Sequence, residues 1–365
     1  MQCYAHVCIT LHPNSLTAEK VVDLRRQETS IEDIARVAGV SHSTVSRALN
    51  NSKLISVEMR ERIQRLSQEM GYTPNAIARS LQNQRTNTIG LVVTSIADPF
   101  FSDIAKGVEE VAQALGFSIV LCISHNDPEQ EMSIIETLHQ RRVDGIIVAA
   151  ARVSSIHQER LSRIQVPTIL INSQTESQNG SPLQWVAIDD FAGARLAVEH
   201  LLQLGHCKIG YIGIESRPKS NRQRFTGYQQ TLKKAGVAPQ EDWVAFCPDG
   251  VYEDGVAGQN LLPRLIEAGV SAVFCYNDMV AIGALRACHE RGIVVPDECS
   301  VVGFDDIMMA DYVTPPLTTV HQLKVEMGQQ AMEMVYDLLN GLAVDNHMVS
   351  PTLKVRASTA TPVQP

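Results

Sequence analysis

The feature that most constrains this chain is an alternation, from residue 88 onward, of short β-branched apolar runs with longer amphipathic segments. The first series reads TIGLVVT, residues 101–115, SIVLCIS, residues 129–141, VDGIIVAA, residues 155–164 and PTILIN. Strands that are apolar throughout are typical of a parallel sheet with helices on both faces. In the first amphipathic segment, Ile104, Val108 and Leu115 fall on one stripe, spaced for packing on a sheet. The pattern predicts an α/β fold.

A second series repeats the theme with WVAIDD, residues 191–204, KIGYIGI, residues 220–235, WVAFC, residues 254–268, SAVFCYN, residues 278–291 and SVVGFDD. We therefore expect two doubly wound parallel sheets with a cleft between them. In such folds ligands bind beyond the carboxyl ends of the strands. The polar residues at those positions are Asp98 to Asp103, Asn172, Asp189, Asp190, residues 215–224, Asn277, Asp278, Asp305 and Asp306.

Charge is unevenly distributed along the 365 residues, of which 44% are hydrophobic and 19% charged, enough to bury a large core. The formal net charge is −9. Residues 29–86 hold eight Lys and Arg against five Asp and Glu, a net +3, so the remainder carries −12. A basic head on an acidic body suits a protein that approaches phosphate with one end, although a solvated helical face could produce the same asymmetry.

Several classes of protein are disfavoured by what the sequence lacks. The eight cysteines form no CxxC pair, and several lie in apolar runs, as buried thiols of a reducing compartment do. No apolar run reaches the length of a membrane span, and residues 1–28 lack a signal-peptide pattern, so we expect a disordered leader on a soluble cytoplasmic protein. There is no GxSxG, GxxxxGK[ST], GxGxxG after a strand or HExxH. We expect no catalysis, no cofactor and no metal site.

The stretch VSHSTVSRAL predicts the second helix of a helix-turn-helix. Residues 31–38 read as the first helix, Gly39 permits the sharp turn, and Ser41 can cap the next helix. Val45, Ala48 and Leu49 form its inner face, and a third helix follows at residues 57–70. The groups facing away can bond base edges or phosphates, and they are His42, Ser43, Ser46 and Arg47. Two helices joined by a glycine turn also occur in proteins that never bind DNA.

Beyond this head, motifs in a fixed order extend the pattern over nearly all of residues 29–359. They are IEDIARVAGVSHSTVSRALN, GYTPNAIARSLQNQRTNTIGLVV, DPFFSDIAKGVEEVA, RRVDGIIV, GHCKIGYI, YNDMVAIGAL, GIVVPDECSVVGFDD and PPLTTVHQ. On these motifs the chain resembles the LacI/GalR family of bacterial transcriptional regulators. The resemblance implies a helix-turn-helix head, a hinge helix and two periplasmic-binding-protein-like subdomains with an effector cleft between them.

The resemblance assigns His42, Ser43 and Arg47 to base reading in the operator, with Ser41, Thr44 and Ser46 on the same helix. It makes residues 75–81 the hinge helix, whose expected DNA contacts are Asn75, Ala78, Arg79 and Leu81. In the family this leucine wedges into the minor groove, where an apolar side chain unstacks a base step and kinks the duplex. Without the resemblance, Leu81 would read as a core leucine at a domain junction.

The resemblance also assigns effector contacts in the cleft, at Phe100, Phe101, Asn172, Asp189, Ser220, Arg224, Tyr276, Asn277 and Asp305. Acids, amides and an arginine suit a sugar, whose buried hydroxyl groups each need a partner. Asp305 and Asn277 could instead serve local turns and caps, the role we expect for Asp278 and Asp190. Where family members stack an aromatic ring on the effector, this chain has Gly250, so Tyr252 or Tyr276 would have to supply the ring.

These observations predict a homodimeric, DNA-binding repressor that is controlled allosterically by a small-molecule effector, a sugar or a sugar derivative. The alternatives are a regulator with a purine-like corepressor, a sugar-binding protein of the transport type without DNA function, and, more distantly, a sugar enzyme. The predicted organisation is a leader at 1–28, a head at 29–74, a hinge and linker at 75–86, a first subdomain at 87–190 with 322–348, and a second at 191–321 with 349–365.

Overall fold

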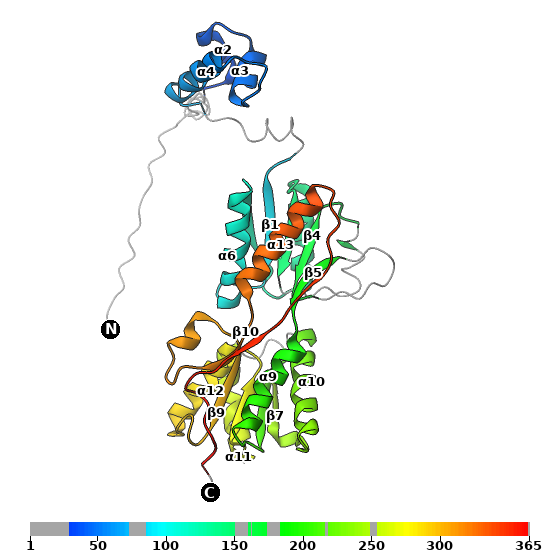
Figure 1. Ribbon diagram of the computed structural model, residues 1–365, viewed down its shortest axis with the longest axis vertical. Helices are drawn as coiled ribbons and strands as arrows, with labels where there is room; N and C mark the ends of the chain where they lie inside the picture. The colour runs from blue at the N-terminus through cyan, green and yellow to red at the C-terminus, as the bar shows by residue number, and fades with distance from the viewer. Residues whose placement is uncertain are drawn as a thin grey trace, which may run out of the picture. The chain divides into compact units, whose positions relative to one another are not determined.

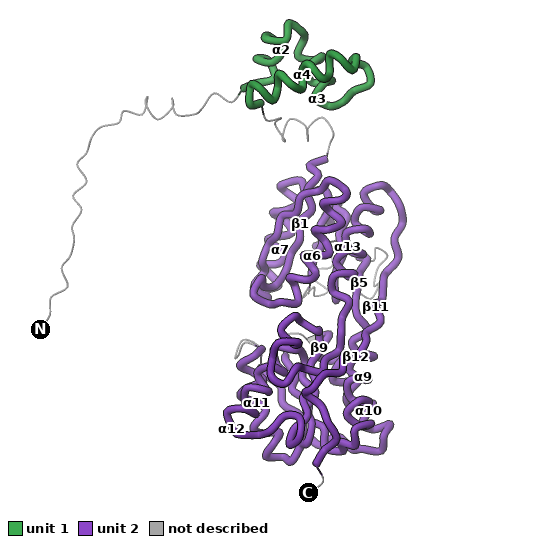
Figure 2. The backbone as a smooth tube through the Cα atoms, turned by 60° about the vertical axis from the view of Figure 1, so that its left-hand side comes forward, with its two compact units in different colours: residues 1–83 green, residues 84–365 purple. Residues whose placement is uncertain are grey.

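The computed structural model describes residues 29–72, 85–149, 160–161, 163–173, 183–215, 218–248 and 254–363. The chain forms two compact units, Met1–Asn83 and Gln84–Pro365, which Figure 2 shows in green and purple. Several predictions lie outside the described residues: the leader at 1–28, the hinge contacts Asn75, Ala78, Arg79 and Leu81, both Gly250 and Tyr252, and most of the helix expected at 155–164.

The first unit contains the three helices that the sequence predicts (Figure 1). They are α2 (Ile31–Ala38), α3 (His42–Leu49) and α4 (Val57–Glu69). Each begins after a serine whose side chain accepts a backbone N–H of the first turn, at Ser30, Ser41 and Ser56. Ile34 and Ile63 are fully buried in the small core that joins the helices.

The second unit begins with a six-stranded parallel sheet in the order β11-β5-β4-β3-β1-β2. Its strands are β1 (Thr88–Val93), β2 (Ser118–Ile123), β3 (Gly145–Ala149), β4 (Thr168–Ile171), β5 (Gln184–Ile188) and β11 (His347–Val349). Helices α6 (Pro99–Ala114) and α13 (Lys324–Leu339) pack on one face, where Leu91 meets Ile104 and Ala331. Helix α7 (Pro128–Gln140) packs on the other, where Val92 meets Ile135.

A second six-stranded sheet follows, in the order β12-β10-β9-β8-β6-β7. Its strands are β6 (Ile209–Ile214), β7 (Val244–Cys247), β8 (Ala272–Cys275), β9 (Ser300–Asp305), β10 (Thr318–His321) and β12 (Thr352–Lys354). Helices α9 (Asp190–Gln203) and α10 (Pro218–Lys234) cover one face, and α11 (Asp254–Glu267) and α12 (Asp278–Arg291) the other. Short 3-10 turns lie at η2 (Glu241–Trp243) and η3 (Met308–Asp311). The sheet is not wholly parallel as predicted, because β12 returns antiparallel along β10.

The chain passes between the two sheets three times. It crosses between β5 and α9, between β10 and α13, and between β11 and β12. Val349 pairs with Ile188 in the first sheet, so the third crossing follows Val349, one residue later than the sequence suggested. Asp190 is likewise the first residue of α9, on the side of the second sheet. The crossings bring the carboxyl ends of both sets of strands to one region.

One strand departs from the prediction that every strand is covered on both faces. Strand β2 is apolar in sequence, yet Val120 is 38% exposed and Leu121 46% exposed. It lies at the edge of the first sheet, paired only to β1 among the described strands. A run of apolar residues does not distinguish a central strand from an edge strand, because both pack at least one face on helices.

Candidate functional sites

Helix α3 is positioned by a tight turn and a serine cap. Gly39 has a φ of 69°, in the left-handed region that residues with a Cβ atom rarely adopt, and it turns the chain after α2. The Ser41 hydroxyl then accepts the Thr44 backbone N–H at 3.2 Å. Val45 and Ala48 are fully buried in the head core. The local sequence therefore fixes which face of α3 points outward.

The outward face of α3 carries the polar side chains predicted to read DNA. His42, Ser43 and Arg47 are exposed, whereas Thr44 and Ser46 are half-buried. The Ser41 hydroxyl lies 2.9 Å from the Ser43 hydroxyl and 2.9 Å from that of Thr44, so its role in the structure is to cap the helix.

Arg47 differs from the other arginines of the described head. Arg36 pairs with Asp33 at 2.8 Å, and Arg62 donates to the Ala38 carbonyl at 3.4 Å. Arg60 and Arg65 also donate to backbone carbonyls of the head. Arg47 has no such partner among residues 29–72. Its guanidinium is left for a group outside the head.

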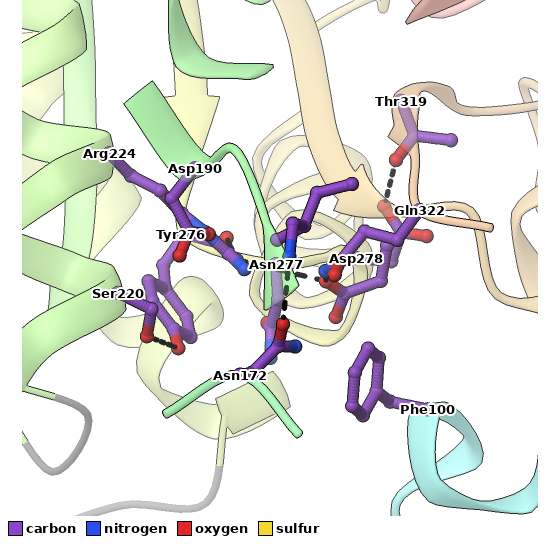
Figure 3. A network of polar contacts seen from close by, with 12 residues as sticks. Phe100, Asn172, Asp190, Ser220, Arg224, Tyr276, Asn277, Asp278, Thr319 and Gln322 are labelled. Atoms are coloured by element: carbon purple, nitrogen blue, oxygen red, sulfur yellow. Dashed lines mark hydrogen bonds and ion pairs between the residues drawn. The ribbon is translucent and has the colours of Figure 1, made fainter. Parts of the chain in front are cut away.

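A second polar cluster lies in the other unit, where strands of both sheets end (Figure 3). Arg224 on α10 is at its centre, with a side chain only 4% exposed. Its Nε donates to Asp190 Oδ1 at 2.7 Å, and its Nη1 donates to the Tyr276 carbonyl at 2.5 Å. Nη1 also lies 3.7 Å from Asp305 Oδ1, and the guanidinium lies 3.6 Å from the centre of the Phe304 ring. Three chain segments besides α10 thus hold one buried cation.

Asp305 ends strand β9 with a φ of 114°, a strained value for a residue with a Cβ atom. Gln322 Nε2 donates to its Oδ1 at 2.5 Å, and Lys324 Nζ donates to its carbonyl at 2.5 Å. Burial raises the pKa of the Asp305 carboxyl to about 7; Asp98 adds to the rise, and Arg224 and Lys324 oppose it. Near neutral pH this carboxyl can therefore accept or donate a hydrogen bond.

The first sheet contributes two of the predicted polar residues, Asn172 and Asp189. Asn172 follows β4 with a φ of 57°, and its Oδ1 accepts the Ile188 N–H at 3.1 Å. Its Nδ2 bonds to none of the described residues. Asp189 caps α9 by accepting the Ala192 N–H at 2.8 Å. Both side chains are placed by local backbone bonds, and Asn172 keeps its amide donors for another partner.

The two neighbouring phenylalanines have different positions. Their rings meet edge to face, with centroids 5.2 Å apart. Figure 3 shows the Phe100 ring directed toward the polar cluster. Phe101 is only 2% exposed and packs in the core between α6 and the first sheet. Phe100 borders the cluster, and the contact through Phe101 stays a prediction.

Two acids that were expected to cap helices are core residues instead. Asn277 caps α12, accepting the Val280 N–H at 2.9 Å, while Asp278 is fully buried. Asp278 accepts the Thr319 hydroxyl and, at 2.8 Å, the Ile307 N–H. A Cβ atom on Gly303 would lie 2.2 Å from Asp278 Oδ1, so the glycine makes room for it. Asp278 therefore joins α12 to strand β10 and to the segment that follows β9.

The same division of roles between two adjacent polar residues occurs at the start of α9. Asp189 is the cap, and Asp190 is the buried partner of Arg224. In both pairs the first residue satisfies the helix end, and the second is directed into the interior. The expectation for Asp190 was wrong because adjacent polar residues look alike in sequence, although they point in different directions.

Tyr276 and Ser220 complete the cluster on the side of the second sheet. The Ser220 and Tyr276 hydroxyl groups are 2.7 Å apart. Arg224 lies 4.5 Å from the centre of the Tyr276 ring and so covers one face of it. Of the predicted effector contacts, the structure therefore brings together Phe100, Asn172, Ser220, Arg224, Tyr276, Asn277 and Asp305.

Gln322 and Lys324 were missed by the sequence analysis. They follow β10, so the rule that pointed to the other strand ends would have found them had that strand been recognised. Lys324 is 4% exposed and lies 3.4 Å from Asp103 of α6, while bonding to the Asp305 and Asp306 carbonyls. One buried ammonium thus connects the first sheet's helices with the end of β9.

Comparison with known proteins places the chain in a family. A model described as "Bacterial regulatory proteins, lacI family" matches residues 30–75, and one described as "Periplasmic binding protein-like domain" matches residues 198–359. The HTH-type transcriptional regulator DegA of Bacillus subtilis is 36% identical over 335 residues, which cover 91% of this chain and 98% of DegA. The chain belongs to the lacI family.

Further members agree with this assignment. The HTH-type transcriptional repressor PurR of Histophilus somni is 31% identical over 91% of this chain and 99% of its own length. The crystal structure of the Lac repressor dimer bound to operator and the anti-inducer ONPF matches with a TM-score of 0.81, at 28% identity, over 92% of this chain and 100% of that one. The resemblance stated from the motifs is confirmed, and so is the implied order of a helix-turn-helix head followed by two periplasmic-binding-protein-like subdomains.

Membership in the lacI family makes this chain a DNA-binding transcriptional regulator with an effector-binding domain, and not an enzyme. It therefore excludes the transport-type alternative without DNA function. Among the described residues, no group of three His, Cys, Asp or Glu could hold a metal ion. Nor does any helix described here have the length and apolar character needed to cross a bilayer.

Proposed function

We propose that this lacI-family member is a homodimeric repressor, acting in the cytoplasm, that binds a pseudo-palindromic operator and responds to a sugar or sugar derivative. The proposal rests on the cleft cluster around Arg224 and, for DNA, on the unpaired guanidinium of Arg47. Arg47 can be bidentate to guanine, and His42 and Ser43 flank it on the exposed face of α3.

One observation favours a sugar as the effector. Gln322 is fully buried, and its Oε1 has no hydrogen-bond partner among the described residues. A buried acceptor without a partner is unfavourable by about 1–3 kcal/mol, which a ligand hydroxyl could recover. Asn172 Nδ2 offers a donor nearby in the cluster, and a sugar hydroxyl both donates and accepts.

Ring geometry argues against a purine as the effector. A purine depends on stacking, and Arg224 already covers one face of the Tyr276 ring. A purine-like corepressor is the second candidate, and it would have to stack on Phe100.

The coupling between cleft and operator would be a shift of populations between two arrangements of the subdomains. An effector shifts that balance only by its difference in affinity for the two arrangements. Lys324 is placed to transmit such a change, because its ammonium contacts Asp103 of α6 and the backbone of Asp305 and Asp306.

Fluorescence anisotropy with DNA from upstream of the protein's own gene tests the proposal. The full chain should bind one segment of it in preference to a shuffled segment at moderate salt, and one sugar of a panel should change that affinity. A panel of nucleobases serves as the comparison. If the chain prefers no segment, the proposed operator binding is wrong. If only a nucleobase changes the affinity for DNA, the effector is the purine-like corepressor and not a sugar.

A further inference from the structure

A cavity lies between the subdomains, beside the cluster around Arg224. Its volume is about 580 Å³, within the roughly 300–1,000 Å³ typical of ligand sites. The first sheet lines it with Thr94, at the end of β1, and with His125 and Asn126, after β2. The second contributes the starts of α11 and α12, including Val256 and Met279. None of the effector contacts predicted from the sequence lines this cavity, although Asp98, one of the predicted strand-end residues, does.

The cavity adjoins the effector cluster through one hydrogen bond. Asp254 lines the cavity, and its Oδ2 accepts the Asn277 amide at 2.6 Å. Asn277 in turn follows β8 directly after Tyr276, whose carbonyl binds Arg224. A ligand seated on the cluster could therefore extend into the cavity past Asp254 and Asn277.

Two polar atoms of the cavity wall lack partners within the described residues. The Thr94 side chain is 2% exposed, and its hydroxyl is buried without a hydrogen bond. Asn126 Oδ1 is also buried and unpaired, in a turn where His125 and Asn126 both have positive φ, 51° and 61°. Native structures leave few such atoms unsatisfied, so each points to a group that the protein binds.

The charged groups of the cavity already have partners. Arg286 pairs with Glu290 at 2.9 Å, Asp98 caps α6 through the Phe100 N–H at 3.0 Å, and Asp254 holds Asn277. What is left for a ligand is the Thr94 hydroxyl, the Asn126 amide oxygen, the exposed His125 ring and apolar surface. The apolar part of the wall comes from Ala97, Pro99, Val256, Met279 and Ile282. A sugar ring, with hydroxyl groups at its edge and an apolar face, has this combination.

We infer that the effector has two rings: a disaccharide or similar glycoside whose second ring occupies the cavity at Thr94 and Asn126. This inference rests on the proposed sugar effector and adds the size of the ligand. A monosaccharide would bind at the cluster around Arg224 and leave Thr94 and Asn126 without partners.

Isothermal titration calorimetry on the full chain, with matched pairs of probes, tests the inference. The pairs are D-glucose with cellobiose, D-galactose with lactose, and D-xylose with xylobiose. For the pair that binds, we expect the disaccharide to bind at least about tenfold more tightly than its monosaccharide, since a second ring adds hydrogen bonds and buried apolar area.

Two variants test whether the difference in affinity between disaccharide and monosaccharide arises in the cavity. Thr94→Val removes the hydroxyl at nearly constant shape and should weaken the disaccharide about three- to tenfold, with the monosaccharide unchanged. Thr226→Val is the matched control, at a hydroxyl on α10 that bonds to the Arg222 carbonyl. Val256→Trp, at a side chain 41% exposed, should fill the cavity and abolish the preference, and Val355→Trp, at 59%, should not.

The results of these titrations distinguish a failure of the two-ring inference from a failure of the proposed sugar effector. If a monosaccharide binds as tightly as its disaccharide, or Thr94→Val weakens both equally, the second ring is excluded while the sugar effector stands. If no sugar binds, the sugar effector and the two-ring inference both fail. Thermal melts of each variant show whether a loss reflects unfolding.

Discussion

The outward face of helix α3 and the cluster around Arg224 both gather polar side chains, but in opposite physical states. On α3, Arg47 is exposed and has no partner in the described head. In the cleft, Arg224 is 4% exposed and binds groups from three other segments. The polar groups of an exposed surface can stay hydrated until a large partner binds. In a buried polar site, most groups must already have hydrogen-bond partners within the protein before the ligand binds. Substitutions should therefore act on binding at α3 and on stability in the cleft.

The largest effect should come from Arg224→Ala. It leaves Asp190 buried without its partner, and breaking a buried ion pair in this way destabilises a protein by about 3–5 kcal/mol. Urea denaturation measures the change. Arg286→Ala is the matched control, because its pair with Glu290 is exposed and such pairs contribute at most about 1 kcal/mol. Equal effects of the two substitutions would remove the contrast between surface and cleft.

The next effect should appear at α3. Arg47→Ala should reduce the preference for operator over random DNA by about 1–3 kcal/mol, if the guanidinium reads a base. The free energy of unfolding should be unchanged, since the Arg47 guanidinium is bonded to nothing in the described head. Anisotropy with both DNAs measures the preference, and Arg36→Ala, next to Asp33, is the control. An equal loss on both DNAs would mean that Arg47 contacts only phosphate.

The pH dependence of stability should show the cost of burying the Asp305 carboxyl in the cleft. Its folded-state pKa of about 7 lies above the ordinary value of 3.8, so the folded state holds a proton that the unfolded state has released. Between these two pKa values, this group's contribution makes the protein less stable as pH rises, by at most about 1.4 kcal/mol per pH unit. Urea denaturation at pH 5, 6 and 7 measures the slope.

Asp305→Asn removes this group and should reduce that slope, to which Asp278 and Asp190, whose pKa values burial also raises, still contribute. The pKa of Asp306 is shifted in the opposite direction, so Asp306→Asn serves as the control. Burial opposes ionisation of Asp306, but hydrogen bonds from His321 and Arg356 lower its pKa to about 2. Its stabilisation is therefore full above pH 4 and lost only as pH falls toward 2, so wild type and Asp306→Asn should share the same slope between pH 5 and 7. A wild-type slope unchanged by Asp305→Asn would assign the titration to another group.

The smallest expected effects distinguish the roles of Ser41 and Ser43 at the start of α3. Ser41→Ala removes the helix cap and should destabilise the head by about 1 kcal/mol. Ser43→Ala should leave stability unchanged and weaken operator binding, because its exposed hydroxyl bonds only to Ser41 among the described residues. Hydrogen exchange of the α3 amides in the full chain reports stability, and anisotropy reports binding. Faster exchange in Ser43→Ala would show that it also supports the helix.

The sequence by itself determined the elements whose causes are local. Helix α2 occupies the predicted residues 31–38, because its serine cap and Gly39 are adjacent to it in the chain. Helix α11 begins at the predicted Asp254 and ends one residue early. The alternation of apolar runs with amphipathic segments was enough to predict two α/β sheets, since each run must bury its own side chains.

Only the tertiary structure decided which member of each polar pair is directed into the interior. The local sequence does not show which of Asp189 and Asp190, or of Asn277 and Asp278, is buried. The role of Asp190 depends on Arg224, 34 positions away in the chain, and that of Asp278 on Thr319, 41 positions away. The unpaired oxygen of Gln322, the exposed edge of β2 and the cavity beside Thr94 arise in the same way. A side chain's local role follows from its neighbours in sequence, but its partners are set by strands and helices that meet only when the chain folds.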